Sequence, residues 1–221
     1  MPTYQYYLFD FDGTLCHSHS AIRYCILETI AQFGFVAPAE HRLAATFKYG
    51  LSLTKTFHEL LGDAADDTLI TDMVANYRRI YLEQGIAKTA PFEGIAALLK
   101  TLKDNGAALA IASNKTTKSI EHSLLHFDIA HYFDLVIGDT PGITQKPNPM
   151  MYHQIVKQHY PTLNDKEVLM IGDTTTDIHF AKSIPVDVCW VRYGYGDHEE
   201  CLQLEPNFII NHPHELLDIA G

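Results

Sequence analysis

The sequence predicts an α/β protein with a doubly wound parallel sheet and an inserted helical domain. From residue 95 onward, short apolar runs of strand length alternate with stretches of helical period. Such alternation is typical of a parallel sheet covered by helices on both faces. Between the first apolar run and residue 86, helical patterns follow one another with no strand between them. This second pattern indicates a small helical domain inserted after the first strand.

The first predicted strand is the apolar run Tyr6-Tyr7-Leu8-Phe9, followed by Asp10, Asp12 and Gly13. Side chains alternate along a strand, so the two carboxylates point the same way. In an open α/β sheet, ligands bind at the carboxyl ends of the strands. Two carboxylates that converge there repel each other unless a cation or a shared proton relieves them. An Asp-Gly turn with both charges solvated is the alternative that this stretch alone leaves open.

Apolar spacing and Gly or Pro punctuation predict four helices in the inserted block, over residues 22–33, 39–47, 55–61 and 68–83. Gly85 to Gly94, which contains Pro91, is typical of a return linker. We therefore expect a core of residues 1–15 and 87–221 and a helical cap of residues 16–86, with hinges at 13–18 and 85–91.

The remaining pattern alternates regularly. Helices are predicted over residues 95–105, 116–127, 149–159, 174–184 and 213–219. Strands are predicted over residues 107–112, 133–137, 168–171, 186–191 and 208–210.

Three of these strands end in polar residues: Ser113-Asn114, Gly138-Asp139 and Gly172-Asp173. Because strand ends share one edge of a doubly wound sheet, these side chains can converge with the acids after the first strand. Each also has a simpler interpretation, since Ser113 or Asp173 could cap the helix that follows. Two further candidates are Asp177, which could be a solvated first-turn acid, and Lys146, which could be an exposed loop lysine.

Taken together, the candidates indicate chemistry at one small surface. Four carboxylates contribute to it, those of Asp10, Asp12, Asp173 and Asp177. Oxygen ligands at that density suit Mg²⁺. The helix start after Ser113 and the ammonium of Lys146 suit a phosphate. A carboxylate nucleophile, Mg²⁺ and donors for phosphoryl oxygens are what transfer through an aspartyl-phosphate requires.

The chain resembles the haloacid dehalogenase superfamily of phosphotransferases on four motifs in the family's order. They are Asp10-Phe11-Asp12-Gly13-Thr14-Leu15, Ala112-Ser113-Asn114-Lys115, Gln145-Lys146-Pro147-Asn148-Pro149 and Gly172-Asp173-Thr174-Thr175-Thr176-Asp177. Two further stretches are similar to the phosphoglycolate-phosphatase-like branch, Pro91-Phe92-Glu93-Gly94 and Val191-Arg192-Tyr193-Gly194-Tyr195-Gly196. The resemblance implies a Rossmann-like core with a helical cap inserted directly after the first motif.

The resemblance also implies roles for the reacting groups. Asp10 would be the nucleophile that attacks phosphorus. Asp12 would protonate the leaving alcohol and then take a proton from the hydrolytic water. Lys146 would be the third catalytic residue.

The same resemblance implies how metal and phosphate would be held. Mg²⁺ would be bound by Asp10, the backbone carbonyl of Asp12, and Asp173, while Asp177 would orient Lys146 or a metal-bound water. Ser113, Asn114 and Lys146 would bind the phosphoryl oxygens. Thr14 would help to position Asp12.

Substrate choice is expected from the cap. A loop aimed at the site could carry Lys48 and Tyr49, and Arg23 on the first cap helix could assist. Such cations would suit an anionic substrate, for example a phosphorylated hydroxy acid. The alternative is that these side chains are ordinary solvated surface.

The formal net charge of -11 argues against nonspecific binding to nucleic acid or to anionic membranes. The four cysteines show no zinc-ligand spacing, and no signal peptide or long apolar run is apparent. We expect a cytoplasmic protein with reduced thiols, monomeric or homodimeric, whose partner is a small phosphorylated metabolite.

The predicted function is a Mg²⁺-dependent phosphatase that acts on a phosphoglycolate-like metabolite through an aspartyl-phosphate. Alternatives on the same core are a sugar phosphomutase and a pyrophosphatase. Outside the enzymes, a catalytically silent binding or regulatory protein is the alternative. Retention of the repelling acids Asp10, Asp12 and Asp173, together with Lys146, counts against silence.

Overall fold

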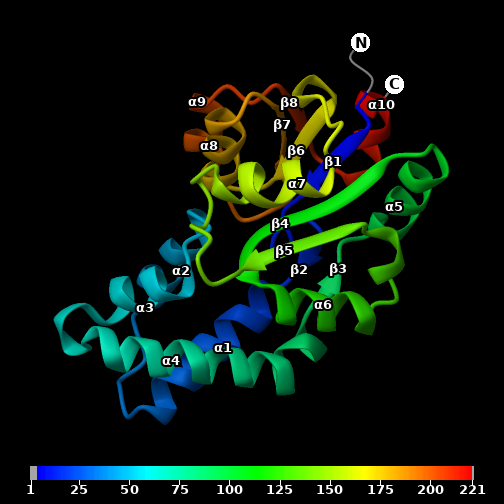
Figure 1. Ribbon diagram of the computed structural model, residues 1–221. Helices are drawn as coiled ribbons and strands as arrows, with labels where there is room; N and C mark the ends of the chain where they lie inside the picture. Colours follow the sequence, from blue (N-terminus) through cyan, green and yellow to red (C-terminus); the bar gives the residue numbers. More distant parts are fainter. Residues whose placement is uncertain (1–3, 221) are drawn as a thin grey trace.

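The computed structural model of the protein describes residues 4–220, with one parallel sheet at its centre (Figure 1). Its strands are β1 (Tyr6–Phe9), β4 (Ala108–Thr116), β5 (Leu135–Asp139), β6 (Val168–Gly172), β7 (Asp187–Val191) and β8 (Phe208–Ile210). They form a six-stranded sheet in the order β5-β4-β1-β6-β7-β8, and every neighbouring pair is parallel. The predicted α/β class with a parallel sheet is therefore confirmed.

Each face of the sheet has its own apolar core. One face packs against α5 (Ile95–Asp104), α6 (Thr117–His126) and α10 (Leu216–Ala220). The other packs against a π-helical turn (Tyr152–Val156), α8 (Thr175–Ser183) and α9 (His198–Gln203), and the short α7 (Lys157–His159) continues the π-helical turn without adding a residue to this core. The alternation along β1 sends Tyr7 and Phe9 into the first core and Leu8 into the second. Burial on both faces explains why the strands are continuously apolar.

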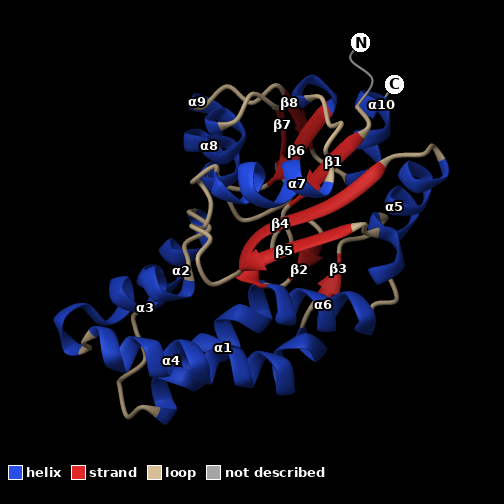
Figure 2. Cartoon of the chain, in the orientation of Figure 1, coloured by secondary structure: helices blue, strands red, loops and turns tan. Residues whose placement is uncertain are grey.

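Residues 19–85, which follow β1, form a helical block beside the sheet (Figure 2). Its elements are α1 (His19–Gln32), α2 (Glu40–Lys48), α3 (Leu53–Leu61), α4 (Asp67–Ile80) and a π-helical turn (Tyr81–Gly85). The block has an apolar cluster of its own, built on Ile26, Phe57, Met73 and Tyr77 among others. The exact domain boundaries stay a prediction.

Two short strands join the helical block to the sheet and were not predicted. Strand β2 (Cys16–His17) pairs antiparallel with β3 (Ala90–Pro91). The two segments along which the chain enters and leaves the block therefore lie side by side, inside the residues expected to act as hinges.

Element ends differ from the predictions where tertiary pairing extends or replaces local signals. Strand β4 runs on past residue 112, because β5 continues to pair with it as far as Thr116 opposite Asp139. The helix that follows is capped by Thr116, whose side chain accepts a hydrogen bond from the Ser119 backbone. Ser113 is thus not a helix cap, and that simpler interpretation is wrong. Helix α9, capped by Asp197, was missed because it has only six residues.

The position of β1 decides where a ligand can bind. This strand pairs with β4 on one side and β6 on the other, although all three are far apart in sequence. β4 and then β5 extend the sheet on one side of β1, and β6, β7 and β8 extend it on the other side. Such a reversal of strand order opens a crevice at the carboxyl ends of the strands, which is where open α/β sheets bind ligands.

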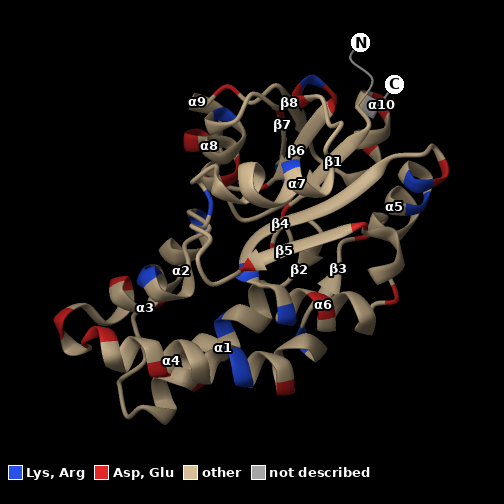
Figure 3. Cartoon of the chain, in the orientation of Figure 1, with Lys and Arg blue, Asp and Glu red and all other residues tan. Residues whose placement is uncertain are grey.

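Lys and Arg residues are spread over several elements, α3, α4 and α5 among them (Figure 3). Acidic residues include Asp63, Asp66 and Asp67 at the connection between α3 and α4.

Within residues 4–220, no helix combines the length and apolar character needed to cross a membrane.

Packing on the second face of the sheet predicts a large effect for Leu8→Ala. The side chain is fully buried on the central strand, so we expect a loss of about 2–5 kcal/mol in the free energy of unfolding. Val36→Ala is the matched control, because Val36 is 90% exposed and its loss should change stability by less than about 0.5 kcal/mol. Urea unfolding of both variants measures the difference; equal midpoints would contradict this packing.

Candidate active site

A cavity of about 440 Å³ lies between the carboxyl edge of the sheet and the helical block. The core side of its wall includes Asp10, Ser113, Lys146 and Asp173, and the helical side includes Arg78. Apolar side chains of the block line it as well, namely Ile22, Ile26, Phe47, Leu51 and Leu53. The cavity therefore joins a charged floor to a roof in which these apolar side chains alternate with polar ones, namely Thr46, Ser52, Thr54, Thr56 and Arg78.

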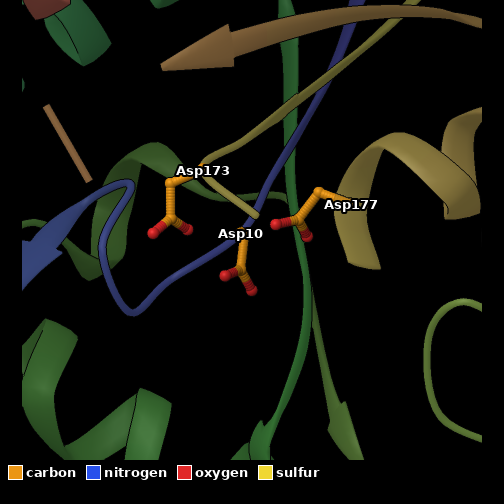
Figure 4. Close-up of side chains that lie close together, drawn as sticks. All are labelled: Asp10, Asp173 and Asp177. Atoms are coloured by element: carbon orange, nitrogen blue, oxygen red, sulfur yellow. The ribbon is translucent and has the colours of Figure 1, made fainter. Parts of the chain in front are cut away.

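Three carboxylates converge on the floor of the cavity: Asp10 after β1, Asp173 after β6, and Asp177 in the first turn of α8 (Figure 4). One oxygen from each lies within 4.8 Å of the others, and all three residues are buried. The acids come from chain segments more than 160 positions apart, so only the parallel pairing of β1 with β6 brings them together.

Lys146 holds two of these acids. Its Nζ lies 2.9 Å from Oδ1 of Asp10 and 2.6 Å from Oδ1 of Asp177. The remaining oxygen of Asp177 accepts hydrogen bonds from the backbone N–H and the hydroxyl of Thr174. Burial lowers the pKa of Lys146, but the attraction of Asp10 and Asp177 outweighs it and raises that pKa to about 12. Lys146 is a buried cation, and the interpretation as an exposed loop lysine is wrong.

The side chain of Asp173 is fully buried and forms no ion pair with any residue from 4 to 220. It accepts hydrogen bonds from the Thr14 hydroxyl at 3.3 Å and from the Tyr195 backbone N–H at 2.8 Å. The backbone at Gly13, with φ of +81°, passes so close that a Cβ there would lie 2.1 Å from Oδ2 of Asp173. The helix cap of α8 is Thr174, not Asp173. The geometry thus holds this carboxylate in place without neutralising its charge.

The electrostatics of the cluster fit a bound cation. Burial, with the repulsion of Asp177 and Asp10, raises the pKa of Asp173 well above its usual range. Burial likewise raises the pKa of Asp10 to about 6, with Lys146 acting in the opposite sense and Asp177 in the same one. A divalent cation would relieve this repulsion, and an all-oxygen donor set suits a hard ion such as Mg²⁺. The residues present therefore fit the predicted metal.

Asp12 faces a different partner. Both of its oxygens lie 3.1 Å from Nζ of Lys115, which also sits over the ring of Tyr81, 3.7 Å from the centroid. Burial acts against the charge of Lys115, but the attraction of Asp12 raises the pKa of this lysine above its usual value. Asp12 is therefore held at the cavity by a cation that the sequence analysis did not single out.

Ser113 and Asn114, both from the second motif, contact different parts of the site. Ser113 is buried beside Asp10, and its hydrogen bond to Asp10 helps to lower the pKa of that carboxyl. The side chain of Asn114 instead holds the loop of Lys146, since its Oδ1 accepts from the Lys146 N–H at 2.9 Å and its Nδ2 donates to the Lys146 carbonyl at 3.1 Å. Its amide therefore positions Lys146, while the expectation of direct phosphate contact finds no support in this arrangement.

Comparison with known proteins decides the family. Residues 7–191 match the model of the haloacid dehalogenase-like hydrolases. The chain belongs to this family. The predicted membership, inferred from four short motifs, is confirmed.

The relatives of this hydrolase cover it almost completely. It is 29% identical to the pyrophosphatase PpaX of Halalkalibacterium halodurans over 97% of this chain and 95% of that protein. It is 26% identical to the phosphoglycolate phosphatase of Vibrio vulnificus over 96% and 94% of the two chains. A haloacid dehalogenase-like family hydrolase from Streptococcus pneumoniae superimposes with a TM-score of 0.86 at 25% identity, over the full length of both chains.

The residues predicted to set substrate specificity lie away from the cavity lining. Lys48, Tyr49 and Arg23 do not line the cavity. Each is paired with a surface acid instead: Lys48 with Asp197 at 3.0 Å, Tyr49 with Glu200 at 3.3 Å, and Arg23 with Glu40 at 2.8 Å. The segment approaches the site with its backbone, since the Gly50 carbonyl accepts from Asn114. Thr14 is also corrected, because its hydroxyl contacts Asp173 rather than Asp12 or the cavity.

Three residues that line the cavity were given no role by the sequence analysis, Arg78, Lys115 and Tyr195, and a fourth, Asp139, was named there only as a strand end that can converge on the site. Lys115 directly follows Asn114 in the second motif, and Asp139 ends a predicted strand, so both had a signal in the sequence. Arg78 lies inside a long helix where nothing marks it, and only its contact with Asp139 at the end of β5 shows that it belongs to the cavity wall.

The unpaired charge of Asp173 predicts that Asp173→Asn is more stable to heat than the wild type without divalent cations and less stable with Mg²⁺. Without divalent cations, Asp173→Asn should raise the Tm by about 2–4 °C, because the uncompensated buried charge is removed while both hydrogen bonds can be kept. With Mg²⁺ at a hundredfold its Kd, the wild type should gain about 5 °C or more and the variant much less. Thermal unfolding with and without Mg²⁺ measures both effects; a variant that gains as much as the wild type would exclude Asp173 as a ligand.

Proposed function

We propose that this hydrolase is a Mg²⁺-dependent phosphatase that cleaves a small phosphorylated metabolite through an aspartyl-phosphate on Asp10. The observation that carries the proposal is the position of the Asp10 carboxylate. It lies in the cavity wall, beside the unpaired carboxylate of Asp173 and 2.9 Å from the ammonium of Lys146. A nucleophile, a cation site and a fixed positive charge for phosphoryl oxygens are thereby combined.

In the proposed reaction, an oxygen of Asp10 forms a bond to phosphorus as the bond from phosphorus to the leaving oxygen breaks. Asp12, in its protonated form, donates that proton to the leaving oxygen, which departs as an alcohol. A water molecule then gives a proton to Asp12 and attacks the same phosphorus, which breaks the bond between phosphorus and the oxygen of Asp10. Phosphate leaves, and both carboxyl groups return to their starting states.

The phosphoryl oxygens would be held by Lys146 and by the hydroxyl of Ser113, which both lie at the cavity floor beside Asp10. Asp177 and Asn114 would act by holding Lys146 in place, the first through its carboxylate and the second through its amide. Lys115 would keep the carboxyl group of Asp12 at the cavity.

Asp10, Asp173 and the backbone carbonyl of Asp12 would hold Mg²⁺. When bound, the ion would neutralise charge that develops on the phosphoryl group during transfer. The four cysteines are free and buried, which supports the further proposal of a cytoplasmic, thiol-reducing setting.

A pyrophosphatase is the second candidate, supported by the likeness to a protein of that name. The apolar side chains of Ile22, Ile26 and Phe47 in the roof favour a leaving group with a carbon skeleton, which inorganic pyrophosphate lacks.

The nucleophile is tested with p-nitrophenyl phosphate. Asp10→Asn should lower kcat by at least about a thousandfold, because the amide cannot form the acyl phosphate. EDTA should abolish wild-type turnover and excess Mg²⁺ should restore it. The exposed Asp63 supplies the matched control, since Asp63→Asn removes the same charge away from the cavity. Turnover that survives in the Asp10 variant would contradict the mechanism.

The two candidate functions predict opposite preferences between phosphoglycolate and pyrophosphate. We expect kcat/KM for phosphoglycolate to exceed that for pyrophosphate by about tenfold or more, the discrimination a shaped apolar pocket provides. Phosphate release from each substrate at matched Mg²⁺ measures the ratio. A ratio in favour of pyrophosphate would make the second candidate the function.

A further inference from the structure

Arg78 is the cation that the helical block presents to the cavity. The other two cations in the wall, Lys115 and Lys146, belong to the sheet side, where each is held against carboxylates close to the reacting atoms. Arg78 comes from α4, on the opposite side, and contacts the carboxylate of Asp139 at the end of β5. A leaving group extending away from Asp10 would meet this pair.

The pairing of Arg78 is incomplete. Within residues 4–220, one of its terminal nitrogens donates to Asp139, and its Nε is buried without a hydrogen-bond partner. The side chain as a whole is 40% exposed and that of Asp139 25%. A guanidinium offers five donors in a planar fork that matches two oxygens of one anion. An enclosed donor without an acceptor is unfavourable, and a bound oxyanion would supply the missing acceptor.

The sheet geometry sets the distance of this pair from the nucleophile. Asp139 ends β5 and Asp10 follows β1, with β4 between the two strands. Two strand spacings separate these ends by about 10 Å across the sheet. A small phosphate monoester bound with its phosphorus at Asp10, whose leaving group ends in a carboxylate or second phosphoryl group, would direct that anion toward the pair of Arg78 and Asp139.

We propose that Arg78 selects substrates whose leaving group carries a second anionic group, which replaces Asp139 as its partner. Asp139 holds the guanidinium in position in the free enzyme and competes with the substrate for it. The inference rests on the proposed phosphatase function and adds the residue that determines its substrate class. It replaces Lys48, Tyr49 and Arg23, which lie outside the cavity.

The test compares two substrates of the same length, phosphoglycolate and 2-hydroxyethyl phosphate, which differ in the charge of the end remote from phosphorus. Arg78→Ala should lower kcat/KM for phosphoglycolate by about tenfold to a hundredfold. The same variant should change kcat/KM for 2-hydroxyethyl phosphate by less than about twofold, because that substrate makes no charged contact with Arg78.

Two further variants sharpen the test. Asp139→Asn should raise kcat/KM for phosphoglycolate by about two- to fivefold, since the competing anion is removed. Arg79→Ala is the matched control, because Arg79 follows on the same helix, is 51% exposed and pairs with Glu83. It should behave like the wild type with both substrates.

Each contrary outcome has a distinct meaning. Equal losses for both substrates in Arg78→Ala would overturn the inference and assign the ion pair to holding the block against the sheet. Losses in Asp139→Asn that parallel those in Arg78→Ala would overturn it as well. If the wild type hydrolyses neither ester nor p-nitrophenyl phosphate with Mg²⁺, the proposed function itself fails. Hydrolysis without discrimination by charge removes only the role of Arg78.

Discussion

Mutual repulsion among buried carboxylates at the carboxyl edge of the sheet is the constraint on which the rest of the site depends. Asp10, Asp173 and Asp177 offer oxygens within 4.8 Å of one another, and one lysine ammonium is in contact with two of them. Such a cluster costs free energy unless the fold holds it and a cation relieves it. Continuous apolar packing on both faces of β1 and β6 supplies the rigidity. The site is thus stabilised from a distance by the two cores of the sheet.

Hydrogen bonds from several chain segments hold the acids of the site in place. Asp177 is fixed by the capping box of its own helix and by Lys146, and Lys146 is fixed in turn through Asn114. Tyr195 connects the acids to the entry of the helical block, because its N–H donates to Asp173 and its phenol oxygen accepts from the backbone of Ser18 and His19. Asp173 is therefore held by a residue that also contacts the start of α1.

Charge around the cavity is balanced locally. Asp12 is paired with Lys115, Asp10 with Lys146, and Asp139 with Arg78. The first two pairs lie on the sheet side and the third crosses to the helical block. Asp173 is left as the acid without a cationic partner among residues 4–220. The two ends of the cavity therefore differ, with buried acids at the floor, one of them unpaired, and an ion pair between Asp139 and Arg78 at the far side.

The sequence by itself determined the α/β class, the insertion after the first strand, and the acids and lysine of the core site, because strand-end carboxylates carry a signal that survives without neighbours. Local pattern also placed β8 at residues 208–210 as the structure has it. Only the tertiary structure decided that β4 continues to Thr116, since that extension depends on pairing with β5. The choice among cap cations was likewise decided there. The sequence analysis expected Lys48 in a loop aimed at the site and gave Arg78, inside a long predicted helix, no role. Only the contacts of the folded chain show that Arg78 lines the cavity beside Asp139 while Lys48 pairs with Asp197 at the surface.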